Sequence, residues 1–154
     1  MDQAFVMAFA ESAKKTFRDM FGLDAKALGT RTLDSSDDHG WDLTGLVGLA
    51  GQAQGVVAVR LTLALAASLL AGSGVATAGD DERLQMEAGL VGELTNIIAG
   101  SATTALKGLN VEIAPPVVVR GPNHKIGWPA IAPVVAVSFG LPEGSFEVDL
   151  CVKT

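Results

Sequence analysis

The hydrophobic and polar positions along the chain change between helical and strand spacing, and these changes predict a series of elements. Residues 2–21 carry apolar side chains at helical intervals with charged side chains on the other faces, which predicts an amphipathic helix that Gly22 ends. The pattern then changes to short runs rich in Val, Leu and Thr separated by turn residues, which is typical of strands. These runs predict strands at residues 26–34, 41–50 and 54–61.

The second half of the chain is predicted to contain two helices and then three more strands. Thr62 can cap a short helix that reaches Leu70. Asp80 and Asp81 can begin a long helix, because acidic side chains are favourable in the first turn, and we expect this helix to end near Leu109. The further strands are predicted at residues 111–119, 130–139 and 145–153.

Two prolines and the order of the elements indicate the fold class. Because Pro115 and Pro116 cannot donate to a strand ladder, their strand should lie at a sheet edge or begin only after them. The strands do not alternate with helices, so a doubly wound nucleotide-binding fold is disfavoured. We therefore expect an α/β (α+β) fold over a single domain, residues 1–154. In this fold a mixed, mostly antiparallel sheet of about six strands packs with a long central helix and an N-terminal helix.

Composition and charge narrow the possible partners. The 154 residues are 49% hydrophobic and 18% charged, which provides enough apolar material for a sizeable core. The formal net charge of −6 comes without a compensating basic cluster, so the chain lacks the electrostatic attraction on which nucleic-acid binding depends. Arg60 and two glycines interrupt the most apolar region, residues 55–77, and this disfavours a membrane span. The N-terminus does not resemble a secretory signal, so we expect a cytoplasmic protein.

Two other groups of reactive side chains are interpreted as structural. Cys151 is the only cysteine, and strand alternation places it on the face opposite the apolar side chains of its strand. An acidic loop lacks the glycine and the terminal glutamate of a calcium loop, so no metal site is predicted. This loop contains Asp34, Asp37, Asp38, His39 and Asp42.

The long helix carries the candidate catalytic pair, Glu93 and Asn96. Their spacing of three residues brings their Cβ atoms within roughly 5–6 Å, so both side chains can act on one partner. Gly89 and Gly100 lie one turn away on the same face, and with Gly92 they suggest that another backbone approaches the helix closely. The alternative is that the pair is merely solvated and that the glycines permit packing of the N-terminal helix. The opposite, sheet-facing stripe comprises Leu84, Val91, Leu94, Ile98, Ala102 and Ala105.

The segment from Gly92 to Gly100, followed by Ile113-Ala114-Pro115-Pro116-Val117-Val118-Val119 and Gly121, resembles the CheX branch of the CheC/CheX/FliY phosphatases. The resemblance extends from the first helix to the last strand. It implies a CheX-like fold and a phosphatase that hydrolyses the aspartyl phosphate of a CheY-type response regulator. It also implies that Asn96 orients the attacking water while Glu93 pairs with a lysine of the regulator. The regulator's own acids would hold Mg²⁺, so no cofactor is expected in this chain.

The resemblance leaves several alternatives open. Many relatives carry Asp or Ser where this chain has Gly89, so either that position is dispensable or this chain acts on its regulator with reduced activity. The rival hypothesis is a non-catalytic receiver-docking module of the same fold in a chemotaxis or motility complex, and a small-molecule-binding or structural dimer ranks last. CheX-type relatives form dimers, and a proline-limited edge strand is compatible with strand pairing, so we expect a homodimer.

Overall fold

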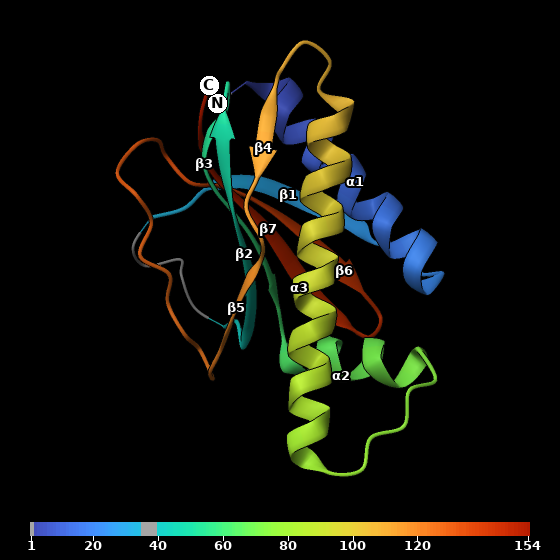
Figure 1. Cartoon of the computed structure of the whole chain (residues 1–154). Coiled ribbons are helices and arrows are strands. Elements are labelled where there is room, and N and C mark those ends of the chain that lie inside the picture. Colours follow the sequence, from blue (N-terminus) through green and yellow to red (C-terminus); the bar gives the residue numbers. More distant parts are fainter. Residues whose placement is uncertain (1, 35–39) are drawn as a thin grey trace.

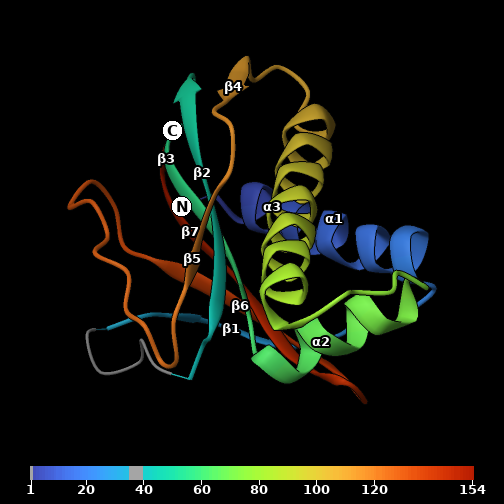
Figure 2. The same ribbon diagram turned by 60° about the horizontal axis from the view of Figure 1, so that its bottom comes forward.

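The computed structural model describes residues 2–34 and 40–154, and it places the helices on one face of a twisted sheet (Figures 1 and 2). The helices are α1 (Gln3–Phe21), α2 (Leu63–Gly72) and α3 (Asp80–Ala105). The strands are β1 (Lys26–Thr32), β2 (Leu43–Gly51), β3 (Gln54–Leu61), β4 (Val111–Ile113), β5 (Val117–Arg120), β6 (Val135–Leu141) and β7 (Gly144–Lys153). None of the helices in the described residues is long and apolar enough to cross a membrane.

The sheet has the order β1-β6-β7-β3-β2-β4, with β5 also paired to β2. All of the pairings between its strands are antiparallel, which confirms the expected type of sheet. In the described part of the chain it has seven strands, where about six were expected, because the strand predicted at residues 111–119 is divided into β4 and β5. Residues 114–116, which include both prolines, separate these two short strands at the edge of the sheet.

Several element boundaries follow from capping residues. The Thr62 side chain accepts a hydrogen bond from the Leu65 N–H at 3.3 Å and caps α2, as predicted. Gly22 has a φ of 66° and ends α1, because glycine adopts the left-handed conformation without strain. The long helix α3 ends at Ala105 rather than near Leu109, since the chain turns before Gly108, whose φ is 87°.

The face of the sheet under the helices is apolar. Because side chains alternate along a strand, the cross-strand row Val59, Val148 and Val137 points to this face and is buried. Phe17 of α1 stacks on Phe146 of β7 with ring centroids 4.1 Å apart. The N-terminal helix is therefore fixed to the centre of the sheet by aromatic packing.

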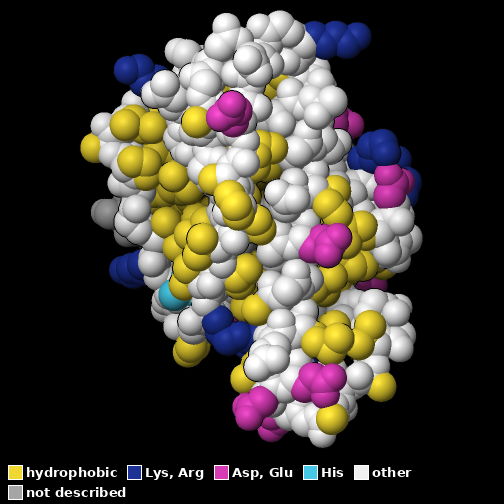
Figure 3. Space-filling view, in the orientation of Figure 1, with side chains coloured by type: hydrophobic (Ala, Val, Ile, Leu, Met, Phe, Trp, Pro, Cys, Tyr) yellow, Lys and Arg dark blue, Asp and Glu magenta, His cyan; other side chains and the backbone are white. Residues whose placement is uncertain are grey.

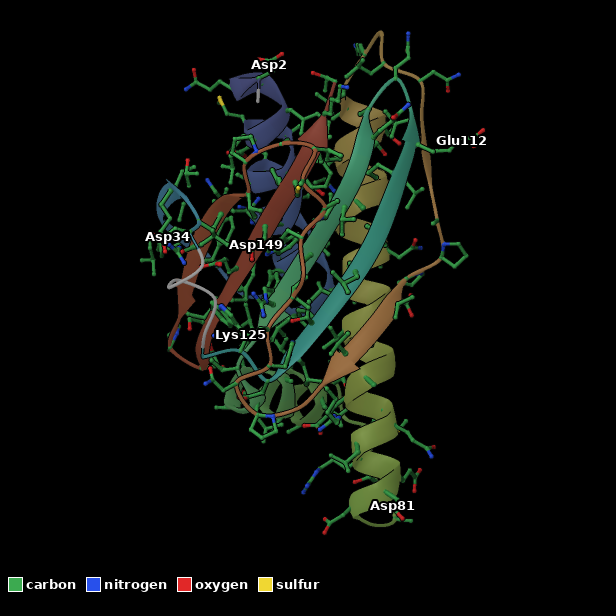
Figure 4. The ribbon with its side chains drawn as sticks, turned by 90° about the vertical axis from the view of Figure 1, so that its left-hand side faces the viewer. Asp2, Asp34, Asp81, Glu112, Lys125 and Asp149 are labelled. Atoms are coloured by element: carbon green, nitrogen blue, oxygen red, sulfur yellow. The ribbon has the colours of Figure 1, made fainter. Side chains whose placement is uncertain are left out.

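The opposite face of the sheet is polar and is crossed by residues 121–134, which we call the strap (Figure 4). The Arg60 guanidinium is fully buried there and donates to the carbonyl oxygen of His124 in the strap at 3.2 Å. The Cys151 thiol donates to the carbonyl oxygen of Pro129 at 3.4 Å. The strand predicted at residues 130–139 begins only at Val135, because the preceding residues belong to the strap.

Candidate functional site

The placement of α3 on the sheet determines which of its side chains reach solvent. Val91, Leu94 and Ile98 are fully buried, which confirms the centre of the predicted apolar stripe. At the two ends of the stripe Leu84 is half-buried and Ala105 is exposed, because the ends of α3 extend past the core. The sequence therefore predicted the orientation of the helix, and the outward face is the one that carries Glu93 and Asn96.

Glu93 and Asn96 are both exposed on the outward face of α3. Among the residues that the structure describes, no hydrogen bond or ion pair involves either side chain. In Figure 3 this face of α3 lies between two groups of hydrophobic side chains. A carboxylate and an amide without internal partners, bordered by apolar surface, are suited to contact another protein.

The glycines of α3 have two different roles. A Cβ on Gly92 would lie 3.2 Å from the Val118 side chain and 3.9 Å from Pro116, so Gly92 allows β5 to pack against the helix. The predicted close approach thus occurs at Gly92, and it is made by side chains rather than by backbone. A Cβ on Gly89 or Gly100 would meet nothing within 4 Å, so packing of α1 does not require either glycine. Because neither glycine has a side chain, no side chain projects from these two positions of α3, one turn before Glu93 and one turn after Asn96.

An ion pair that the sequence analysis missed joins α3 to β5. Arg120 Nη2 lies 3.3 Å from Glu87 Oε1 and donates to the Leu84 carbonyl oxygen at 3.1 Å. Glu87 is buried, with only 1% of its surface exposed. The sequence did contain a signal for this pair: Glu87 lies one turn before Val91 on the apolar stripe, which predicts that its carboxylate is buried. A buried carboxylate needs a cationic partner.

A second buried charged group lies under the strap. Glu147 and Asp149 of β7 point to the same polar face, near Arg60 and Arg31. Glu147 pairs with Arg31 at 2.8 Å, whereas Asp149 Oδ2 lies 3.7 Å from Arg60 Nη1. Burial raises the pKa of Asp149 to about 9, the adjacent Glu147 carboxyl group adds to this shift, and Arg60 opposes it. Asp149 is therefore protonated at neutral pH and holds no net charge under the strap.

The raised pKa of Asp149 makes stability depend on pH. The folded state keeps this proton between about pH 4 and pH 9 while the unfolded state loses it, so stability should fall as pH rises through this range. Asp149→Asn removes the titrating group. Relative to wild type, its free energy of unfolding should therefore rise by about 1.4 kcal/mol per pH unit, or about 4 kcal/mol between pH 5 and pH 8. Urea unfolding at several pH values measures this difference, and exposed Asp19→Asn is the control. Parallel wild-type and Asp149→Asn curves would contradict the assignment.

Three further groups of reactive side chains lie outside α3: Cys151, His124 and the acidic loop. Burial raises the pKa of the Cys151 thiol, and its hydrogen bonds to strap carbonyls are structural. His124 of the strap is half-buried, with Nε2 2.6 Å from Thr44 Oγ1. Of the acidic loop, residues 37–39 lie outside the described part of the chain. Among the described residues, no group of three or more His, Cys, Asp or Glu side chains could hold a metal ion.

Comparisons with known proteins identify relatives of the whole chain. The family model described as "Chemotaxis phosphatase CheX" matches residues 43–140, more than half of the sequence. No curated protein gives a significant match. Chemotaxis protein CheX from Vibrio vulnificus is 27% identical, with a TM-score of 0.83, and the match covers 97% of this chain and 99% of that one.

Two further solved structures share the fold. A CheC-like superfamily protein from Shewanella sp. PV-4 is 25% identical, with a TM-score of 0.88, and the match covers 100% of both chains. The structure of a CheX–CheY–BeF₃–Mg²⁺ complex from Borrelia burgdorferi matches at 24% identity with a TM-score of 0.80, covering 97% of this chain and 98% of that one. The expected fold class is thereby confirmed.

Proposed function

Because this chain belongs to the CheX family of chemotaxis phosphatases, we propose that it hydrolyses the aspartyl phosphate of a CheY-type response regulator. The observation that carries the proposal is the exposure of Glu93 and Asn96 side by side on the outward face of α3. The resemblance of the Glu93–Asn96 segment to this family suggested the same pair, and the Borrelia burgdorferi protein of the same fold forms a complex with CheY.

In this proposal, Asn96 orients the water that attacks the phosphorus atom. Phosphoryl transfer requires little covalent work from the protein, and the rate gain comes from holding the nucleophile in line with the leaving carboxylate oxygen. A side-chain amide is suited to this role because its oxygen accepts one hydrogen bond from the water while its nitrogen donates to a neighbouring oxygen. The water's oxygen bonds to phosphorus, the P–O bond to the aspartate breaks, and the products are inorganic phosphate and the free carboxylate.

Glu93 is proposed to anchor the complex through a lysine of the regulator. This pair would fix the register of α3 over the phosphorylation site and so place Asn96 within reach of the water. Mg²⁺ would be held by acids of the regulator, and this chain would contribute no cofactor. A receiver as substrate would place the activity in the cytoplasm.

The decay of a phosphorylated CheY-type receiver, with and without this protein, tests the proposal. We expect faster loss of the phosphoryl group with the wild-type protein. If the receiver binds but its decay is not accelerated, the protein is the docking module instead. The exposed Gly89, where many relatives carry Asp or Ser, is the feature that would favour that outcome.

Glu93→Gln should weaken docking more than chemistry. It keeps the shape of the side chain but removes its charge, so we expect the KM for the phosphorylated receiver to rise about tenfold, or roughly 1.4 kcal/mol, with a smaller change in kcat. Glu112→Gln is the control, because Glu112 is exposed on the edge strand β4 and its side chain points away from the sheet (Figure 4). Equal KM values for the two variants would refute the role of Glu93.

We also propose that the protein is a homodimer. Every residue of β1 is exposed, and among the described strands β1 pairs only with β6, so a second copy can pair with its outer edge. This edge is formed by one strand, whereas the opposite edge is divided between the short strands β4 and β5. Light scattering should give the mass of two chains, and Leu28→Glu on β1 should shift it toward one. A monomeric wild type would exclude the proposal.

A further inference from the structure

A groove of about 620 Å³ lies between α1 and the C-terminal half of α3. Small side chains of both helices line it, among them Ser12, Ser101 and Ala105. The Ser12 hydroxyl donates to the Ile98 carbonyl oxygen at 2.7 Å, which holds the two helices together at the base of the groove. Ser101, which lines the groove, is exposed and directly follows Gly100, and Gly100 lies one turn after Asn96, so the groove borders the surface that carries the proposed catalytic pair.

The α1 side of this groove carries a group of charged side chains in which cations outnumber acids. This group, which we call the cationic rim, comprises Glu11, Lys14, Lys15, Arg18 and Asp19. Figure 3 shows charged side chains beside α1, on one side of the outward surface of α3. The rim has a local positive excess in a chain whose formal net charge is −6. The sequence alone did not reveal it, because one acid precedes the cations and another follows them.

The cations of the rim are available to a partner. Lys14 contacts Glu11 at 3.2 Å and Lys15 contacts Asp19 at 2.6 Å, and both are surface pairs between neighbouring turns of α1. Such pairs contribute only about 0–1 kcal/mol, so a partner can replace them at low cost. Arg18 is exposed, and among the described residues it forms no ion pair.

We propose that the groove and its cationic rim are a second part of the docking surface, and that they attract the anionic phosphorylation site of the receiver. This inference rests on the proposed function, since an aspartyl phosphate and the acids that hold its Mg²⁺ would give the partner a negative face. Opposite charges at the border of an interface accelerate encounter and orient the partner. Glu93 then pairs with the lysine of that site, while Lys15 and Arg18 contact the acidic surface around it.

Paired charge removals test this inference. Lys15→Gln/Arg18→Gln removes two positive charges from the rim, and the control Lys125→Gln/Lys153→Gln removes two from elsewhere. Lys125 lies in the strap, and Lys153 points to the strap face because the adjacent Val152 belongs to the apolar core. The probe is a CheY-type receiver loaded with beryllofluoride, and its Kd is measured at about 20 mM and about 300 mM salt, which changes the screening length severalfold.

We expect the rim variant to raise the Kd about tenfold at low salt, with a smaller difference at high salt, and the control pair to stay close to wild type. Equal Kd values for the two variants would overturn the inference. A rim variant that loses the mass of a dimer while its Kd stays unchanged would also overturn it, because the groove would then hold a second copy of this chain. The Kd does not depend on catalysis. Failure to accelerate phosphate loss therefore refutes the proposed activity, while equal Kd values refute only the role of the rim.

Discussion

Replacing Asn96 with alanine should lower the kcat for dephosphorylation of a CheY-type receiver by about 100-fold or more, with little change in KM. The amide is exposed and makes no hydrogen bond within the described part of the protein, so its removal should leave folding intact. Its proposed contribution is to hold the water in line with the leaving oxygen, and misplacement by about 1 Å can cost about 10²-fold in rate. Single-turnover decay of the phosphorylated receiver, at saturating and subsaturating concentrations, separates the two parameters.

Gln85→Ala is the matched control for Asn96→Ala. Gln85 is another exposed amide of α3, nearer its N-terminus, and its removal should leave both kinetic parameters close to wild type. Similar loss of kcat in the two variants would indicate a general effect on α3 rather than on a water molecule. Unchanged kcat in Asn96→Ala would remove Asn96 from the mechanism.

Gly45→Val should destabilise the protein by about 3 kcal/mol or more, at the upper end of the cost of overpacking a core. Gly45 lies on β2 directly under α3: even a Cβ there would lie 2.9 Å from the Thr95 Cβ and 3.2 Å from the Val91 carbonyl oxygen. The carbonyl cannot move without displacing the helix. Urea unfolding measures the loss of stability, and receiver decay should be lost too, because Thr95 immediately precedes Asn96.

Gly48→Ala on the same strand is the control for this steric argument. A Cβ at Gly48 would meet the Ala114 side chain at 3.7 Å, an ordinary van der Waals contact. Its effect should therefore be small, about 1 kcal/mol or less. If Gly45→Val were no more destabilising than Gly48→Ala, α3 would have to pack on β2 less closely than the structure has it.

Much of this architecture could be predicted because its signals are local. Strand alternation and the capping residues Thr62 and Gly22 identified the elements, and Pro115 and Pro116 identified the sheet edge. The outward face of α3 followed from the apolar stripe opposite it. The roles proposed for Glu93 and Asn96 rest on the family resemblance, because an acid and an amide three residues apart are common on solvated helices.

The features that escaped prediction depend on contacts between distant parts of the chain. Arg60 and Asp149 lie far apart in the sequence, and they meet only because β3 pairs with β7. The strap covers both side chains. Because it is an irregular segment, its sequence has no periodic pattern of hydrophobic positions from which its place over the sheet could be predicted. Glu87 and Arg120 likewise meet only because β5 packs along α3.

The bonds that fix the strap have a consequence for how this protein can evolve. Arg60 and Cys151 bind carbonyl oxygens of His124, Pro129 and Ala132, and every residue type offers such a carbonyl. Substitutions along the strap can therefore accumulate without loss of these bonds, provided the backbone keeps its path. For these bonds to carbonyl oxygens, the selective constraint falls on the two donors in the sheet. We expect relatives to vary in the segment that covers this face while retaining hydrogen-bond donors at these two buried positions beneath it.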